Sequence, residues 1–343
     1  MKTLDLVVPG LLGPFSADIP GHFSQALKQK KFQGLQQCLS RARLEARAET
    51  NYPATLFSRL PTVAGGVENS LSDLSAAYDN IQIESGYLYR ADPVHFKAES
   101  DHAILLDADV LNIARAEADQ LIELFNRHFA EDGIQLIAGS ATRWYLRTER
   151  PLALNFVPLE DALGRDIKHF MPGGEDALWW RKTLNEAQML FFQHSLNQQR
   201  EAEGRLSING LWLWDMSLTR TAPASHEIIP VFADTELPAI LASAVNDSRP
   251  LSELSALQTN RGLVVTERFY SAFCYGDLDA WFEALDNFVQ GLFAEILCLL
   301  KTEQVHRLDI YPCDGRVFQL HRRQLYKIWL RPQPVTHFFP EVS

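Results

Sequence analysis

Short apolar runs alternate with longer amphipathic stretches along the chain, and this pattern predicts an α/β fold. The run from Leu4 to Val8 is stopped by Pro9-Gly10, which is typical of a buried strand that opens a sheet. Similar runs predict further strands at 87–89, 103–106, 134–137, 144–146, 208–214, 228–232, 262–266, 307–311, 317–320 and 324–330.

Apolar residues at helical spacing predict the helices between these strands. One helix is predicted from about residue 24, others at 41–49, 116–129, 175–202 and 237–244, and a long one after Asp277 as its N-cap. The aromatic stripe of that last helix, with Trp281, Phe288 and Phe293, indicates a core face rather than a ligand cage. Strand–helix alternation at both ends predicts an α/β sheet interrupted by an inserted α+β domain.

Composition and charge narrow the class of protein. A hydrophobic content of 46% over 343 residues indicates a substantial core. The formal net charge of −11 argues against a nucleic-acid partner, which requires a basic surface. Without a run of about 18 apolar residues, we expect no membrane association. Four scattered cysteines and an N-terminus unlike a signal peptide favour a cytoplasmic protein with reduced thiols.

The segment from His194 to Trp214 carries the strongest candidate chemistry. His194, Asn197 and Arg200 are spaced by three, so a continuous helix would place them on one face. Gly204 then ends the helix, and the apolar run from Ile208 to Trp214 predicts a buried strand. Such a polar face beside a strand is suited to lining an anion or small-ligand pocket. An amphipathic helix packed on a strand would give the same spacing, and this alternative stays open.

This segment resembles the cofactor-independent phosphoglycerate mutases, especially the short archaeal type. Those proteins carry a His-Pro-x-Asn-x-x-Arg run, a glycine, an asparagine before a strand and a Trp-Gly ending; here Ser195 replaces the proline and Asp215 replaces the final glycine. An upstream stretch, Gly86–His95, is similar to the family's aromatic-Arg-x-Asn segment. Arg90 matches the arginine, whereas Asp92 and His95 replace an asparagine and a threonine.

The resemblance covers about residues 86–214 and is greatest to shorter bacterial mutase-like regulatory proteins of the RpfE type. It implies a truncated alkaline-phosphatase-like α/β core with an inserted α+β domain. We therefore expect residues 1–80 and 221–343 to form the two parts of the core and residues 81–220 to form the insert. The resemblance also implies a set of substrate-binding residues: Arg90, Asp92, His95, His194, Asn197, Arg200 and Asn209. The spacing of Arg165 adds this residue to the candidate set.

Arg165 and Lys168 are three residues apart and could jointly hold a carboxylate or phosphate. A solvated helix face is the open alternative for this pair. The denser acidic and histidine group between Asp92 and Asp109 looks superficially like a metal site. We interpret it as a solvated turn followed by helix-capping aspartates, because such residues also gather at the surface.

The catalytic half of the family pattern is missing from the sequence. The mutases hold two divalent metals, and their first strand ends in Asp-Gly, where this chain has Pro9-Gly10. The chain's Asp-x-x-x-His motif, at Asp18 and His22, and its Asp-His motif, at Asp101 and His102, lie in the wrong part of the chain. No nucleophile can be named, although Thr62 and Ser72 lie in the corresponding region. We therefore expect neither a metal nor another cofactor.

Three functions fit these features. The first is a non-catalytic mutase-like protein that binds a small anionic ligand or a protein partner and has a regulatory role. The second is a metal-dependent phosphoglycerate mutase or phosphatase with rearranged ligands. The third is a structural interaction module whose former pocket is filled.

Overall fold

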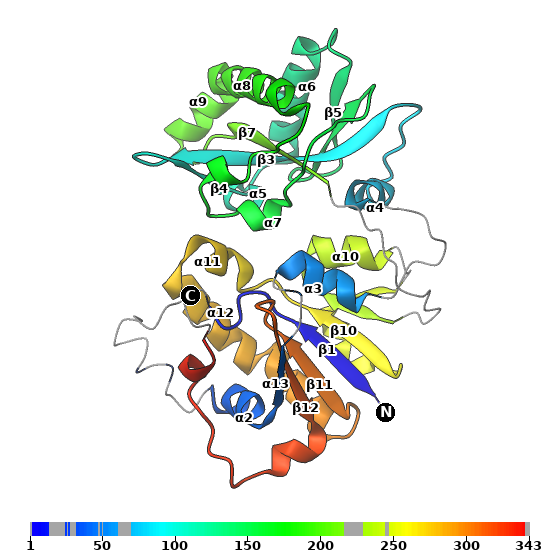
Figure 1. Cartoon of the computed structure of the whole chain (residues 1–343), viewed down its shortest axis with the longest axis vertical. Helices are drawn as coiled ribbons and strands as arrows, with labels where there is room; N and C mark the ends of the chain where they lie inside the picture. Colours follow the sequence, from blue (N-terminus) through cyan, green and yellow to red (C-terminus); the bar gives the residue numbers. More distant parts are fainter. Residues whose placement is uncertain are drawn as a thin grey trace. The chain divides into compact units, whose positions relative to one another are not determined.

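The computed structural model describes residues 2–13, 25, 27, 32–46, 49, 51–60, 70–215, 229–243 and 247–339. Two compact units are present: a split unit formed by Met1–Gly65 and Ala222–Ser343, and a middle unit formed by Gly66–Thr221 (Figure 1). Within the part of the chain that the structure describes, every helix is too short or too polar to cross a bilayer.

The split unit is built on a seven-stranded sheet with the order β2-β12-β11-β1-β10-β8-β9. Strands β1, β8, β9, β10 and β11 run parallel to their neighbours in this set, whereas β12 pairs antiparallel with β11 and with β2. The strand bounds are β1 Thr3–Val7, β2 Arg43–Ala46, β8 Val231–Ala233, β9 Ser248–Pro250, β10 Arg261–Val265, β11 Arg307–Tyr311 and β12 Arg316–His321.

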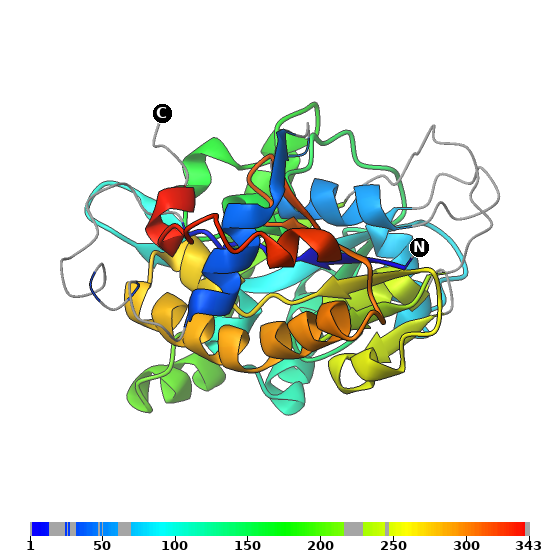
Figure 2. The same ribbon diagram turned by 90° about the horizontal axis from the view of Figure 1, so that it is seen from below.

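The helices of the split unit are α2 Gln33–Arg41, α3 Tyr52–Arg59, α10 Glu236–Ser243, α11 Tyr270–Tyr275, α12 Leu278–Gln290 and α13 Leu292–Lys301, with short 3-10 turns η3 Leu251–Ala256, η4 Arg322–Tyr326 and η5 Val335–Phe338. Gly291 separates α12 from α13. These two helices follow one another along the sheet and are drawn in orange in Figure 2. The Asp277 carboxylate accepts from the Ala280 N–H and caps α12, as the sequence predicts.

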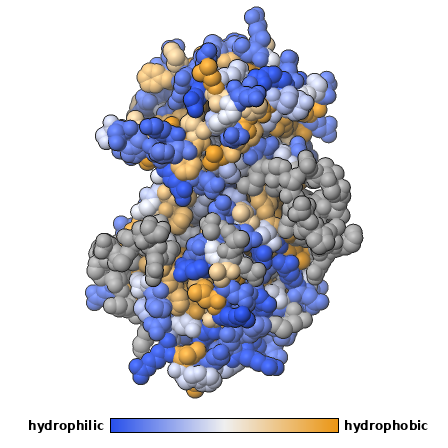
Figure 3. Space-filling view, viewed as in Figure 1, coloured by the Kyte–Doolittle hydropathy of each residue, from blue (hydrophilic) through white to orange (hydrophobic). Residues whose placement is uncertain are grey.

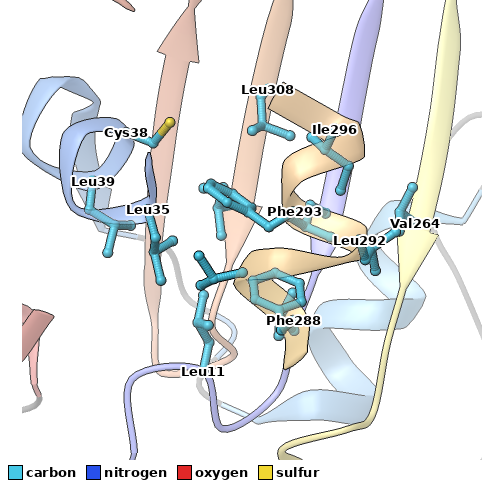
Figure 4. Packing of buried hydrophobic residues seen from close by; sticks show 14 of the residues in the cluster. Leu11, Leu35, Cys38, Leu39, Val264, Phe288, Leu292, Phe293, Ile296 and Leu308 are labelled. Atoms are coloured by element: carbon cyan, nitrogen blue, oxygen red, sulfur yellow. The ribbon is translucent and has the colours of Figure 1, made fainter. Parts of the chain in front are cut away.

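One face of this sheet carries the apolar core. Side chains from alternate strand positions, such as Leu308 and Val264, meet α2, α12 and α13 (Figure 4). Phe288 and Phe293 lie at the centre of this layer, and both are fully buried. Alternation along the strands explains the arrangement, because residues two apart face the same side.

The other face of the same sheet is polar in its centre. Asp5 of β1 lies directly beside Asp309 of β11 in the strand register, and both are buried. Arg261 donates to Asp5 at 2.7 Å and Arg307 donates to Asp309 at 2.6 Å. Burial raises the pKa of Asp309, with the hydrogen bond from Arg307 acting in the opposite direction. Each carboxylate therefore has its own arginine.

The middle unit contains a five-stranded sheet in which β4-β3-β6-β5 form one path and β7 also pairs with β3. All of these pairings are antiparallel. The strands are β3 Tyr87–Ala98, β4 Ala103–Leu106, β5 Ile134–Ala138, β6 Trp144–Thr148 and β7 Gly210–Trp214. The helices are α4 Leu71–Tyr78, α5 Ala108–Leu111, α6 Arg115–His128, α7 Leu159–Ala162, α8 Ala177–Gln193 and α9 Ser195–Ala202, with the 3-10 turn η2 Ile167–His169.

The structure corrects three predicted elements. The predicted helix at 41–49 contains strand β2, because pairing of Arg43–Ala46 with β12 overrides its charged, helix-compatible composition. The predicted strand at 324–330 is instead the end of η4 followed by a turn. The predicted helix at 175–202 is interrupted at His194, where the backbone is extended.

The unit boundaries also differ from the predicted segments. The first predicted segment extends to residue 80, whereas α4 belongs to the middle unit. The Ser72 hydroxyl of α4 is fully buried and accepts a hydrogen bond of 2.9 Å from the Arg90 N–H of β3. Ser72 thus has a structural contact, and Thr62 lies outside the described residues.

We predict that Phe288→Ala lowers the free energy of unfolding by about 3–5 kcal/mol, because it removes a ring from a close-packed core. Phe288 packs against Phe269 and Phe293 with ring centroids 5.4 and 5.5 Å apart. Urea unfolding followed by circular dichroism measures the change. The matched control is Phe192→Ala, since Phe192 is 69% exposed and its replacement should cost less than about 0.5 kcal/mol. Equal losses in the two variants would contradict the core assignment.

Candidate functional site

Arg90 and Asp92 form one buried group in the middle unit. They lie two residues apart on β3, and the Arg90 guanidinium donates to both Asp92 oxygens, at 3.2 and 2.7 Å. The same carboxylate accepts from the Trp144 backbone N–H at 3.2 Å and from the Trp214 indole N–H at 2.8 Å. Arg90 also lies over the rings of Trp214 and Tyr145, at 5.2 and 5.7 Å. Asp92 therefore serves as the counter-ion of Arg90 inside a closed network.

A second arginine–aspartate pair lies beside this network. Arg143 donates to Asp79 through two nitrogens, one of them at 2.6 Å, and the Tyr145 hydroxyl donates to the same carboxylate. Burial raises the pKa of Tyr145, so this hydroxyl is a hydrogen-bond donor and not an acid at neutral pH. No sequence motif marks this pair, because Asp79 and Arg143 are far apart in the chain.

The segment from His194 to Arg200 does not present one polar helical face. His194 precedes α9 in an extended conformation, and its Nδ1 accepts from the Leu196 N–H at 3.2 Å. It therefore caps the helix and does not share a face with the residues inside it. Asn197 uses its amide to hold the incoming strand: it donates to the Phe191 and Ile208 carbonyls and accepts from the Ile208 N–H, each at 2.8 Å.

Arg200 is fully buried and has a partner for each donor group. It donates to Glu117 at 2.7 Å, to the Leu111 carbonyl at 2.6 Å and to the Leu206 carbonyl at 2.8 Å. Glu117 also accepts from Arg205 and from a backbone N–H at the start of α6. Burial opposes ionisation of Glu117, but these hydrogen bonds outweigh it, and the pKa of Glu117 is lowered. The carboxylate is therefore charged and neutralises Arg200.

His95 and Asn209 lie at the other end of the β3–β7 pairing. The His95 Nδ1 is 2.8 Å from the Ser207 carbonyl, and burial lowers the pKa of the imidazole. The Asn209 side chain accepts from the Phe96 N–H at 2.7 Å and donates to the Phe96 carbonyl at 3.1 Å. Both side chains thus complete the backbone hydrogen bonding of neighbouring segments.

The strand register separates the two ends of this candidate site. Arg90 pairs with Trp214, and Asn209, immediately before β7, precedes that residue by five positions. At about 3.3 Å per residue, the two lie roughly 16 Å apart along the strand. Arg90 and Asn209 therefore lie at opposite ends of the β3–β7 pairing. Arg165 is exposed, lies over the Phe170 ring at 5.7 Å, and is outside both networks.

The described residues hold no cluster of three or more His, Cys, Asp or Glu side chains that could bind a metal ion. Asp101 pairs with His102, and Asp107 caps α5 through the Val110 N–H. Asp18 and His22 lie outside the described residues. Sequence reasoning missed Glu117 and Asp79, because their arginine partners are distant in the chain.

The turn that follows β1 is closed by aromatic packing. Gly10 has a φ of +78°, and a Cβ placed there would lie 2.6 Å from the Phe273 side chain. The Gly10 carbonyl accepts from the Trp281 indole N–H at 2.8 Å. Pro9 itself offers no side-chain donor atom to a metal ion. This turn is a packed structural feature, which is not the Asp-Gly ending that the family resemblance would require.

At the carboxyl ends of β8 and β10, Asp234 is already engaged. It accepts from the Thr266 hydroxyl and from Arg268, both at 2.9 Å. Glu267 accepts from the Tyr52 hydroxyl. Ligands of α/β sheets bind at this edge of the sheet as a rule, so these residues are the split unit's candidate polar site.

No protein-family model matches the chain. A probable 2,3-bisphosphoglycerate-independent phosphoglycerate mutase of Geobacter sulfurreducens is 25% identical over 158 residues, which is 46% of this chain and 40% of the relative. The mutase of Methanosarcina mazei is 23% identical over 134 residues, 38% of this chain and 34% of the relative. The chain thus spans about two-fifths or less of the curated relatives it matches.

Two solved structures are similar at low identity. A Pyrococcus horikoshii protein is 12% identical with a TM-score of 0.48. The superposition covers 93% of this chain and 87% of that protein. The cofactor-independent phosphoglycerate mutase of Thermoplasma acidophilum is 15% identical with a TM-score of 0.40, and the superposition covers 94% of this chain and 90% of that mutase. By its sequence matches, the chain is a distant relative of the cofactor-independent phosphoglycerate mutases.

Proposed function

We propose that this chain is a non-catalytic, mutase-like protein with a regulatory or ligand-binding role. The observation that carries the proposal is that the two arginines that match the mutase motifs have internal counter-ions. Arg90 is paired with Asp92 and Arg200 with Glu117. An anionic substrate would have to displace a buried carboxylate from either arginine. Leaving such a carboxylate unpaired costs several kcal/mol, so phosphate binding at these arginines is disfavoured.

The identity of residue 92 supports this interpretation. The mutase motif that Gly86–His95 resembles has an asparagine there, which carries no charge. Asp92 supplies a fixed anion two residues from Arg90, on the same face of β3. A single side chain thus changes Arg90 from a free cation into half of a structural ion pair.

The carboxyl edge of the split unit supports the same proposal. Two-metal phosphoryl transfer requires several unengaged carboxylates or imidazoles directed at one point. Here Pro9 stands after β1, and Asp234 is held by Thr266 and Arg268. These contacts therefore support a non-catalytic role for the carboxyl edge of the split unit.

We predict that Arg90→Ala destabilises the protein by about 3–5 kcal/mol, because it leaves the buried Asp92 carboxylate without its counter-ion. Arg200→Ala should also destabilise it, because the Leu111 and Leu206 carbonyls lose their donor, although Arg205 still pairs with Glu117. Thermal unfolding measures the loss, and Arg165→Ala, at an exposed site, should change little. Millimolar phosphate or 3-phosphoglycerate should not raise the melting temperature of the unsubstituted chain. Ligand stabilisation that disappears in Arg90→Ala without loss of stability would instead support an anion pocket.

Asp92→Asn isolates the charge, because it keeps the size of the side chain. We predict lower stability together with new stabilisation by phosphate, since Arg90 would lack its internal anion. Glu117→Gln should likewise lower the stability and allow phosphate to stabilise the protein at Arg200. Asp119→Asn, at an exposed ion pair, serves as the matched control. A stable Asp92→Asn protein that phosphate leaves unchanged would show that Asp92 does not hold Arg90 away from an anion.

A direct assay separates the proposal from the metal-dependent alternative. After incubation with Mn²⁺ and gel filtration, we expect no stoichiometric metal and no interconversion of 3- and 2-phosphoglycerate. The Methanosarcina mazei mutase is the positive control in the same assay. Two bound metals per chain with chelator-sensitive turnover would refute the non-catalytic proposal and support rearranged ligands.

A further inference from the structure

The turn that follows η4 exposes large apolar side chains. We call residues 326–330 the apolar turn. Ile328 is 83% exposed and Trp329 is 73% exposed, and Tyr326 and Leu330 beside them are also exposed. The Ile328 N–H donates to the Tyr326 carbonyl at 2.8 Å and the Leu330 N–H to the Lys327 carbonyl at 3.1 Å. Ile328 and Trp329 therefore lie at the tip of a hydrogen-bonded turn.

Both ends of the apolar turn are fixed to the end of α2. Arg41 is buried and donates to the Leu325 carbonyl, and the Gln324 amide donates back to the Arg41 carbonyl at 2.9 Å. Beyond the turn, the Gln333 N–H donates to the Ser40 hydroxyl at 2.8 Å. This anchoring holds the apolar tip in the solvent rather than against the core, at the cost of its exposure to water.

The sequence on both sides of the turn is basic, although the chain as a whole is acidic. No Asp or Glu occurs from Gly315 to Pro340, in a chain with 43 acidic residues. Arg322 pairs with Glu303 at 3.0 Å. The other cations near the turn are Arg323, Lys327 and Arg331, and none of them has an ion pair with a described residue. Apolar and hydrophilic residues are mixed over the face shown in Figure 3.

We propose that the apolar turn binds the surface of an anionic lipid bilayer. Ile328 and Trp329 enter the headgroup region, where tryptophan is favoured because its ring is apolar and its N–H is polar. Arg323, Lys327 and Arg331 contact anionic headgroups, and their aliphatic stems lie along the apolar boundary. Two highly exposed apolar side chains at the tip of a turn suit insertion between lipids better than a flat contact with an acidic protein.

This interfacial contact differs from a membrane span. The expectation of no membrane association rests on the lack of a long apolar run. That argument excludes a membrane-spanning helix but does not address a short turn that binds the membrane surface. The net charge of −11 opposes approach to an anionic surface, but salt screens charges beyond about 8–10 Å. Close to the surface, the local cations of the turn determine the interaction. The proposal does not depend on the absence of catalysis.

The test is co-sedimentation of the full chain with phosphatidylcholine vesicles that contain or lack phosphatidylserine. We expect binding only to the anionic vesicles, and weaker binding as salt is raised. Brominated lipids should quench the emission of Trp329 on binding. Five other tryptophans, Trp144, Trp180, Trp212, Trp214 and Trp281, are at most 2% exposed, whereas Trp179 is partly exposed. The difference in quenching between the unsubstituted chain and Trp329→Phe therefore isolates the signal of Trp329.

Substitutions locate the contact. Ile328→Ser with Trp329→Ser should weaken vesicle binding by roughly tenfold or more. Lys327→Gln should weaken it by roughly fivefold, the effect of about one lost charge. Phe192→Ser and Arg181→Gln, at exposed positions of the middle unit, are the matched controls and should bind as the unsubstituted chain does. Circular dichroism melts verify that each variant is folded.

Equal binding to neutral and anionic vesicles, or equal losses in the control variants, would overturn the proposal. Failure of the chain to sediment with any vesicle would also overturn the proposal. Binding of polyglutamate through Lys327 would then indicate an acidic protein partner.

Discussion

The buried carboxylate of Asp92 is the constraint on which the middle unit depends. An ionised carboxylate away from water is tolerated only when its oxygens accept several hydrogen bonds. Asp92 receives them from its own strand, from the Trp144 backbone on β6 and from the Trp214 indole on β7. One charge thus fixes how three strands meet, and a shift of any strand by one residue would leave it unsatisfied.

The same requirement recurs wherever the chain buries charge. Glu117 joins the start of α6 to Arg200 in α9, and Asp79 joins the end of α4 to Arg143. In the split unit, Asp5 and Asp309 lie side by side, each with its own arginine. Such pairs add little net stability over apolar residues of similar size, but breaking one is costly. They therefore specify which segments pack together more than they strengthen the fold.

The sequence predicts the elements whose signal is local. The strands at β1, β5, β6 and β11 and the helix that follows Asp277 arise from apolar periodicity and a capping side chain, both contained in a few neighbouring residues. Strand β2 is not predictable in this way, because its conformation comes from pairing with β12. His194 misleads for a related reason: its spacing suits a helical face, whereas its backbone is extended and its ring caps α9.

The candidate site shows the same division between local and distant information. A resemblance at 86–214 correctly indicates a relative of the mutases, yet it cannot say what each matched side chain contacts. Arg200 finds its carboxylate 83 residues earlier in the chain, and no spacing rule connects the two. Asp92, in contrast, is readable from sequence once its charge is considered. An aspartate two positions from an arginine lies on the same strand face and can neutralise it, so the arginine needs no bound anion.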